Sequence, residues 1–346
     1  MSKQSPVEAI ELWLVDEGSP GHFSQSAGLA DALGQLIPVK AHRVSGRTKV
    51  RGWQRHLIRW LMGKRGAALS DAILSRIADV AIPTEAGSPA MIISSGGKSV
   101  FTALALAQRY QVPYVFIGEQ KPYPSSWFDC VVSHVKQEAS ERTIDVELIP
   151  TPVASDSSIF AAEPDPKVWC MIIGGSSRSH VYSDDDWHEL AEGMNALAQR
   201  YQIRWRVTTS RRTGAAAEAI LKKHLDTSQV EDAIWWAEAP RRALYDFIRR
   251  SSVLFVTQDS VTMVTEAVSA RRPVVVVRPQ VTHITEDNFM SSYYGRLEQN
   301  RRVIRTTTQQ LAEAVIEPAS FKLMNGDILR PVAEELLKRL NLSSGP

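Results

Sequence analysis

A histidine at the end of a glycine-rich loop is the first residue in this sequence that could do chemistry. His22 closes the loop Asp16–His22 (DEGSPGH), which follows an apolar, strand-like stretch. Glycines such as Gly21 let the backbone approach a ligand, and the helix start that follows offers free N–H groups. An imidazole can accept a proton at neutral pH, so His22 is a candidate general base, with Asp16 and Glu17 as alternatives. A surface histidine or a capping contact is the structural alternative.

A second glycine-rich turn lies at Ser94–Ser99, with the sequence SSGGKS. Its Gly-Lys-Ser ending is typical of a phosphate-binding P-loop, but that motif also needs a glycine where this chain has Ile92. The P-loop interpretation therefore fails. There remains a turn at a helix N-terminus, in which Gly96 and Gly97 allow close approach and Lys98 can contact an anion.

Glycine and hydroxyl residues gather again after an apolar run at residues 168–173. Backbone amides, hydroxyl groups and a guanidinium at such a turn could cradle a pyrophosphate. The residues of this loop are Gly174, Gly175, Ser176, Ser177 and Arg178. The stretch 208–213 (TTSRRT) ends a further strand and could add Arg211 or Arg212 to the same site.

Two acidic features follow in the same half of the chain. The run Asp184–Asp186 could suggest a metal, but it follows Ser183 at a helix start, where negative charge favours the helix dipole, so we predict capping. Asp259 or Ser260 can cap a later helix, whose second turn carries Glu266. The Glu266 carboxylate could accept hydrogen bonds from two ribose hydroxyls; a solvated helical glutamate is the alternative.

The elements that must position these loops alternate between strand and helix almost throughout, the pattern of parallel α/β sheets. Four prolines between residues 150 and 166 predict a linker at 151–166, since proline removes donors and disfavours helix. We therefore expect two Rossmann-like domains, at 1–150 and 167–325, and a C-terminal helix within 326–346. Two such sheets should face a central cleft, with ligands beyond the carboxyl ends of the strands.

The composition excludes several classes of protein. The chain has 346 residues, 44% of them hydrophobic and 23% charged, which is typical of a globular protein rather than a disordered or coiled-coil one. We find no transmembrane stretch and no secretory signal at the N-terminus. Cys130 and Cys170 lie in apolar runs and are expected to be reduced core thiols, which favours a cytoplasmic location.

Positive charge is concentrated in one segment. Residues 43–65 contain eight Lys or Arg and no acid, on a chain whose formal net charge is only +2. One row at helical spacing is basic and consists of Arg51, Arg55 and Arg59. A second row at helical spacing is apolar and consists of Trp53, Leu57, Trp60 and Leu61. A basic row beside an aromatic row suits an anionic bilayer surface. Packing against the domain is the main alternative, and no nucleic-acid-binding motif accompanies the segment.

Four of these stretches together resemble the "elongated mitochondria" fission family, over nearly the whole chain. They are residues 16–29 (DEGSPGHFSQSAGL), 94–97 (SSGG), 209–213 (TSRRT) and 259–266 (DSVTMVTE). The layout is also similar to GT-B glycosyltransferases, particularly the lipid-linked N-acetylglucosaminyltransferase of peptidoglycan synthesis. The resemblance implies a GT-B-like fold.

The likeness to these enzymes carries over to particular residues. The Gly21-His22 loop matches a glycine-rich loop that ends in histidine, and Glu266 matches a ribose-binding glutamate. Glu119, in the stretch Ile117–Gln120, matches part of a His-Glu-Gln motif with glycine in place of histidine. Asn288 lies where these enzymes contact the donor sugar, and Asp259-Ser260 replaces a Ser-Gly pair.

The resemblance implies a glycosyltransferase that moves a sugar from a nucleotide diphosphate donor, most simply a UDP-sugar, to a lipid or lipid-linked glycan. Its partners would be the donor, the acceptor and an anionic membrane, with no nucleic acid. It would be peripheral on the inner face of the cytoplasmic membrane. Helix dipoles and basic side chains can stabilise the departing diphosphate, so no metal or other cofactor is implied. A GT-B-like sugar-nucleotide epimerase and a non-catalytic adaptor are the alternatives.

Overall fold

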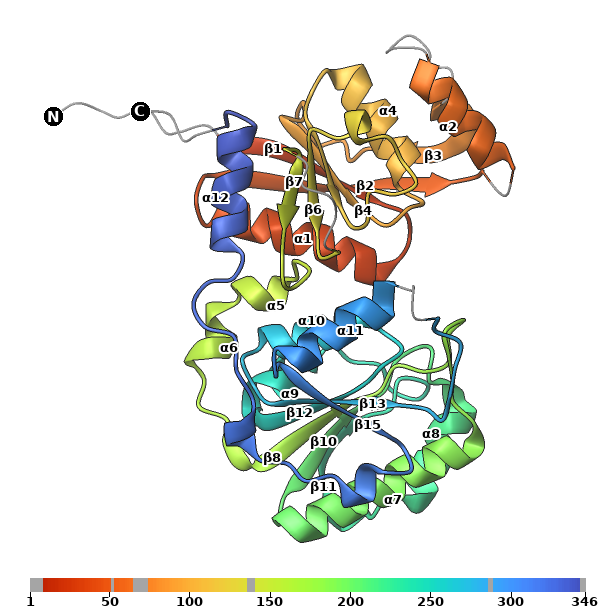
Figure 1. Cartoon of the computed structure of the whole chain (residues 1–346), viewed down its shortest axis with the longest axis vertical. Helices are drawn as coiled ribbons and strands as arrows, with labels where there is room; N and C mark the ends of the chain where they lie inside the picture. The colour runs from red at the N-terminus through yellow and green to blue at the C-terminus, as the bar shows by residue number, and fades with distance from the viewer. Residues whose placement is uncertain (1–8, 51–52, 65–73, 136–140, 286–288, 343–346) are drawn as a thin grey trace, which may run out of the picture. The chain divides into compact units, whose positions relative to one another are not determined.

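The computed structural model describes residues 9–50, 53–64, 74–135, 141–285 and 289–342 (Figure 1). The chain divides into two compact units. Unit 1 comprises residues 1–155 and 327–346, and unit 2 comprises residues 156–326. The last helix thus belongs to the same unit as the first strand.

Unit 1 is built on a seven-stranded sheet of order β3-β2-β1-β4-β5-β6-β7. All neighbouring strands are parallel except β2 and β3, which are antiparallel. The strands are β1 (Ile10–Asp16), β2 (Val39–Thr48), β3 (Ala78–Ala81), β4 (Met91–Ser95), β5 (Tyr114–Ile117), β6 (Cys130–Ser133) and β7 (Thr143–Asp145). The helices are α1 (Pro20–Gly34), α2 (Gln54–Lys64), α4 (Val100–Tyr110), the 3-10 turn η1 (Ser125–Trp127), α5 (Pro152–Ser155) and α12 (Arg330–Arg339).

Unit 2 is built on a six-stranded, all-parallel sheet of order β11-β10-β8-β12-β13-β15. Its strands are β8 (Asp165–Ile172), β10 (Arg204–Thr208), β11 (Val230–Ile234), β12 (Ser251–Thr257), β13 (Val274–Arg278) and β15 (Val303–Thr307). Two short strands, β9 (His180–Val181) and β14 (Val281–Thr282), pair antiparallel outside it. The helices are α6 (Ser157–Ala161), α7 (Asp184–Tyr201), α8 (Gly214–His224), α9 (Leu244–Arg250), α10 (Val261–Ser269) and α11 (Phe289–Gln299), with 3-10 turns η2 (Thr227–Gln229), η3 (Leu311–Glu313) and η4 (Pro318–Ser320).

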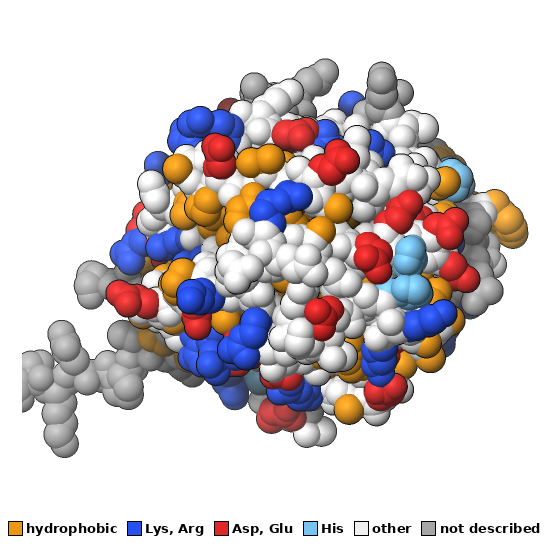
Figure 2. All heavy atoms as spheres, turned by 90° about the horizontal axis from the view of Figure 1, so that it is seen from below, with side chains coloured by type: hydrophobic (Ala, Val, Ile, Leu, Met, Phe, Trp, Pro, Cys, Tyr) orange, Lys and Arg blue, Asp and Glu red, His pale blue; other side chains and the backbone are white. Residues whose placement is uncertain are grey.

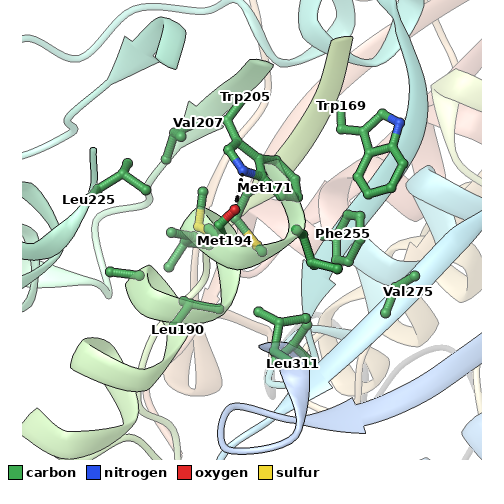
Figure 3. Close-up of a cluster of buried hydrophobic side chains, with 14 of the residues drawn as sticks. Trp169, Met171, Leu190, Met194, Trp205, Val207, Leu225, Phe255, Val275 and Leu311 are labelled. Carbon is green, nitrogen blue, oxygen red and sulfur yellow. Dashed lines mark hydrogen bonds between the residues drawn. The ribbon is translucent and has the colours of Figure 1, made fainter. Parts of the chain in front are cut away.

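Central strands are buried along most of their length because helices cover parallel sheets on both faces. In β4 every residue is buried, and in β8 the buried run begins at Val168. The core of unit 2 is rich in aromatic side chains (Figure 3): Trp205 and Phe255 meet edge to face, and Trp169 stacks on Phe255. The Trp205 indole N–H donates to the Met194 carbonyl at 2.9 Å, so this buried polar group keeps a partner.

Two stretches singled out from the sequence contain regular elements. The proline-rich stretch 151–166 contains α5, α6 and the first residues of β8, and the boundary between the units falls within it, at residue 156. Pro152 stands in the first turn of α5, where a missing N–H costs nothing. The basic segment 43–65 spans two described elements: its first residues complete β2, inside the sheet, and α2 follows.

Both cysteines are free and buried, as expected for core thiols. Burial raises the pKa of Cys130 to about 12 and raises that of Cys170 as well, so both thiols stay protonated at neutral pH. Among the residues that the structure describes, no helix is both long and apolar enough to cross a membrane.

Candidate functional site

In unit 2, three loops at the carboxyl ends of β8, β10 and β12 are fastened to one another through Gly174. Its N–H donates to Thr257 Oγ1 at 2.7 Å, and its carbonyl accepts a hydrogen bond from Ser210 Oγ at 2.7 Å. This is the edge of a parallel sheet at which ligands bind. The structure therefore brings together the stretches 174–178 and 208–213 and the end of β12.

An ion pair joins the second and third of these loops. Arg212 Nη2 lies 2.5 Å from Asp259 Oδ2; the Asp259 side chain is fully buried, whereas that of Arg212 is 40% exposed. Burial raises the pKa of Asp259, and the Arg212 guanidinium opposes that rise. Asp259 is therefore not the helix cap that its position in the sequence allowed. Ser260 is the N-cap of α10, where its Oγ accepts from the Met263 N–H at 3.4 Å.

Both positions at the start of the loop after β8 require glycine, because neighbouring groups lie where a Cβ atom would be. A Cβ on Gly174 would lie 2.2 Å from the Asp259 carboxylate, and one on Gly175 would lie 2.3 Å from the Arg212 carbonyl oxygen. Gly175 also has φ +150°, which side chains rarely adopt. The Gly-Gly pair thus lets the Arg212–Asp259 ion pair pack directly on the loop.

The hydroxyls of this loop shape its own backbone. Ser176 Oγ accepts from the Tyr182 N–H at 3.0 Å, and Ser177 Oγ accepts from the His180 N–H at 3.2 Å. The exposed guanidinium groups of Arg178 and Arg211 lie on the same two loops. The hydroxyls that we expected to bind phosphate are therefore already engaged in holding the loop.

His180 is a residue of this region that the sequence analysis missed. It is buried, and burial lowers its pKa to about 4, with further lowering by the charges of Arg212 and Arg278. His180 is therefore uncharged at neutral pH. Its sequence signal is weak, because β9 has only two residues.

Further along the unit, Glu266 lies on α10 and is buried, so it is not the solvated glutamate of the alternative interpretation. Asn288 lies outside the described residues.

The acidic run at the start of α7 is a capping box, as predicted: Ser183 Oγ accepts from the Asp186 N–H at 3.1 Å, and the Asp186 carboxylate accepts from the Ser183 N–H at 2.9 Å. Burial alone would raise the pKa of Asp186, but these hydrogen bonds outweigh burial and lower it.

In unit 1, His22 lies in the first turn of α1 and contacts a buried acid. Its Nδ1 is 2.7 Å from Glu17 Oε1; the Glu17 side chain is 4% exposed and that of His22 is 41% exposed. The second glycine-rich loop closes against the same ring, since a Cβ on Gly96 would lie 2.2 Å from His22 Nδ1. Gly96 has φ +83°, which favours glycine there.

Asp16 has a structural task instead. Its Oδ1 accepts from the Gly18 N–H at 2.8 Å, and its Oδ2 accepts from Arg43 Nε at 2.9 Å. The Arg43 guanidinium also lies 4.5 Å from the centre of the Phe23 ring. Asp16 therefore holds the loop that carries His22, which leaves Glu17 as the acid in contact with the imidazole.

The other unit 1 residues singled out from the sequence surround these loops. Gly21 precedes His22 in α1, and the Gly97 carbonyl accepts from the Tyr123 hydroxyl at 2.9 Å. Lys98 is exposed in the second loop, and Glu119 is exposed after β5. No contact between Glu119 and His22 is found in the part of the chain that the structure describes.

Two tryptophans, one just before helix α2 and one within it, are exposed. Trp53, Leu57 and Trp60 are 72%, 46% and 55% exposed, while Ile58 is buried in the core of unit 1. The aromatic row is thus not the surface by which the helix packs on its domain. Arg59 donates to the Pro122 carbonyl and to His56 Nδ1. Arg51 and the side chains of Arg55 and Leu61 lie outside the described part of the chain.

Two Rossmann-like parallel-sheet domains, each with glycine-rich loops at its strand ends, define this protein as one of GT-B-like fold. Solved structures share that fold: UDP-GlcNAc 2-epimerase from Neisseria meningitidis bound to UDP-GlcNAc has 13% identity and a TM-score of 0.51, covering 96% of this chain and 100% of that one. A putative UDP-N-acetylglucosamine 2-epimerase from Listeria monocytogenes has 12% identity and a TM-score of 0.51, covering 97% and 98%. The chain belongs to the family described as Mitochondrial fission ELM1, whose model matches residues 20–340.

A third structure, MurG from Acinetobacter baumannii, is matched at 13% identity with a TM-score of 0.45, covering 95% of this chain and 91% of that one. No sequence among curated proteins matches the chain significantly. At identities this low, a structural likeness shows the fold and leaves activity to be argued from the site.

Proposed function

We propose that this protein is a glycosyltransferase that transfers a sugar from a nucleotide diphosphate donor to a lipid or lipid-linked glycan. The observation that carries the proposal is the group of loops at Gly174, on which Arg178, Arg211 and Arg212 bring guanidinium groups to the edge of a parallel sheet. Two structural neighbours, the Neisseria enzyme bound to UDP-GlcNAc and the S. aureus MnaA-UDP co-structure, support a UDP-sugar as the donor.

On the donor side, unit 2 would hold the nucleotide. The guanidinium of Arg212 would bind the diphosphate, whose negative charge increases as the bond to the sugar breaks. Arg178 and Arg211 are further cationic candidates on the same loops. The Glu266 carboxylate would accept hydrogen bonds from the ribose hydroxyls. Because basic side chains supply the countercharge, the reaction as proposed needs no metal ion.

On the acceptor side, His22 of unit 1 would act as general base. Its Nδ1–H donates to Glu17, which leaves the lone pair of Nε2 to accept the proton of the acceptor hydroxyl. The hydroxyl oxygen then bonds to the anomeric carbon of the sugar, and the bond from that carbon to the diphosphate oxygen breaks with its electron pair leaving on the diphosphate. The Glu17 carboxylate would stabilise the imidazolium that forms. Lys98 and Glu119 are candidates for contacts to the acceptor.

A lipid acceptor requires the enzyme to reach a membrane, and α2 suits that task. Trp60 and Leu57 of α2 and Trp53 just before it lie exposed, within a segment that has eight basic residues and no acid. Exposed aromatic side chains combined with Lys and Arg bind anionic interfaces. We therefore place the protein on the inner face of the cytoplasmic membrane, as a peripheral protein.

A sugar-nucleotide epimerase is the second candidate, favoured by the epimerase structures that match over nearly the whole chain. An epimerase would bind the same donor but would need neither an acceptor nor α2. A non-catalytic adaptor of the same fold would bind no nucleotide sugar at all.

One experiment separates the three candidates. The full-length protein is titrated calorimetrically with UDP, UDP-GlcNAc and other nucleotide sugars, and the bound donor is then incubated with and without a lipid-linked acceptor. Glycosylated lipid formed only with acceptor supports the transferase; an isomerised donor formed without acceptor establishes the epimerase. No nucleotide binding across the panel would contradict both enzymes.

A further inference from the structure

Helices α7 and α8 place three metal-ligating side chains together on the surface of unit 2, away from the glycine-rich loops. His188 and Glu192 are four residues apart on α7, and His224 is the last residue of α8. One ligand atom from each residue lies within 4.8 Å of the other two. In Figure 2, histidine side chains lie side by side among acidic and basic ones on one face of the molecule.

The spacing is close to that of a zinc site. The His188 and His224 rings have centroids 4.2 Å apart, and His188 Nε2 lies 3.9 Å from Glu192 Oε1. Tetrahedral zinc, with bonds of about 2.0–2.2 Å, places its ligand atoms roughly 3.3–3.6 Å from one another. The His188 and Glu192 side chains are each about half exposed, so rotations about their own bonds can close the remaining gap.

The side chain of Asn195 ties the end of α8 to α7. Asn195, two turns after His188 on α7, donates from Nδ2 to the His224 carbonyl at 2.8 Å. Its Oδ1 accepts from the Asp226 N–H at 2.9 Å. The end of α8 is thereby fixed against α7, so binding a metal would order only side chains and not a loop.

The charges around the cluster favour a cation. His224 ends α8, where the helix dipole is negative, and the exposed Asp184 and Asp185 lie in the first turn of α7. Lys223 adjoins His224 and is exposed, whereas the ammonium group of Lys222, two residues before His224, is paired with Glu238 and lies 5.0 Å over the Trp235 ring. Lys222 is therefore committed to another contact.

We propose that His188, Glu192 and His224 bind a divalent transition-metal ion, with zinc as the natural probe, and that the ion clamps α8 to α7. Two imidazoles and one carboxylate are a donor set that zinc prefers, and water would complete the tetrahedron. The site takes no part in the proposed sugar transfer, so the two proposals stand or fall separately.

The test is calorimetric titration of Zn²⁺ into the metal-free, full-length protein at pH 7.5, together with thermal melts. We expect one site with a micromolar or tighter Kd and a higher Tm in zinc, because a ligand that binds only the folded state stabilises it. Mg²⁺ should not raise the Tm, since it prefers oxygen ligands in octahedral geometry. His188→Ala and His224→Ala should each weaken zinc binding by at least about tenfold.

His56→Ala is the matched control, because His56 is also exposed and helical but contacts Arg59 instead of a second histidine. It should leave the Kd for zinc unchanged. Circular dichroism without metal establishes that each variant is folded, and Glu192→Gln offers a milder change to the same site. A wild-type Kd near a millimolar, or zinc binding that both His188→Ala and His224→Ala retain, would overturn the proposal.

Discussion

Glu17 and His22 form a carboxylate–imidazole pair in which Oε1 lies 2.7 Å from Nδ1, with the acid buried and the ring half exposed. A buried carboxylate that accepts from one ring nitrogen selects the tautomer and directs the other nitrogen toward a substrate. The local sequence brings the two residues close, since they lie five positions apart across the start of α1.

Replacing His22 by alanine should lower turnover by about 10²–10⁴-fold, because a general base contributes that much to a rate. Donor affinity should be unchanged, because the donor is assigned to unit 2. Steady-state kinetics and calorimetry measure the two quantities. Glu17→Gln should also lower turnover, since it removes the charge that stabilises the imidazolium. A decrease of less than about threefold in His22→Ala would place the base elsewhere.

Replacing Glu266 by alanine should weaken the binding of a nucleoside diphosphate about tenfold or more, because a hydrogen bond to a charged group contributes about 1.5–3 kcal/mol. Calorimetric titration with UDP is the measurement. Glu163→Ala removes an exposed carboxylate of the same unit and serves as the control. Equal UDP affinity in a folded Glu266→Ala protein would remove Glu266 from the site.

Protonation of His180 should destabilise unit 2 in acid. Burial lowers its pKa from 6.5 to about 4, so the folded state keeps it neutral where the unfolded chain protonates it. The resulting stability is fully present above pH 6.5 and is lost as the pH falls toward 4. The shift corresponds to at most about 3 kcal/mol.

The measurement is the free energy of unfolding by denaturant at several pH values from 7 to 4. His180→Gln cannot be protonated in this range, so its stability should depend less on pH than that of the wild type. Parallel curves for the two proteins would show that other groups cause the acid sensitivity.

Removing the exposed aromatic residues of α2 should weaken membrane binding without unfolding the protein. We expect Trp53→Ala with Trp60→Ala to reduce sedimentation with anionic vesicles, since both side chains point outward and would enter the interface. Replacing Arg51, Arg55 and Arg59 by Glu should release the protein too, as each basic residue near an anionic surface contributes about 1 kcal/mol.

Trp236→Ala is the matched control for this experiment, because Trp236 is an exposed tryptophan of unit 2. Binding should also weaken with salt, as the Debye length shortens from about 10 Å at 0.1 M to about 3 Å at 1 M. If the wild-type protein does not bind anionic vesicles at low salt, the proposal of membrane binding is wrong.

The sequence by itself determined the fold class and the positions of the glycine-rich loops. Short, largely apolar runs such as residues 91–95 and 168–173, each followed by glycines, favour buried strands of parallel sheets, and the glycines mark turns of close approach. The capping box at Ser183 was equally predictable, since it depends on residues three apart. Edge strands such as β11 escaped prediction because they are short and carry polar side chains.

Only the tertiary structure decided which distant residues meet. Arg212 and Asp259 lie 47 positions apart, yet they form one ion pair over Gly174, because parallel strands bring their carboxyl ends to one edge. His188 contacts His224 for a similar reason, since helices that pack together bring into contact residues that lie far apart in the sequence. The spacing of residues within a short stretch of sequence does not predict such contacts. Hydrophobic burial positions the strands and helices, and the polar residues at their ends meet as a consequence.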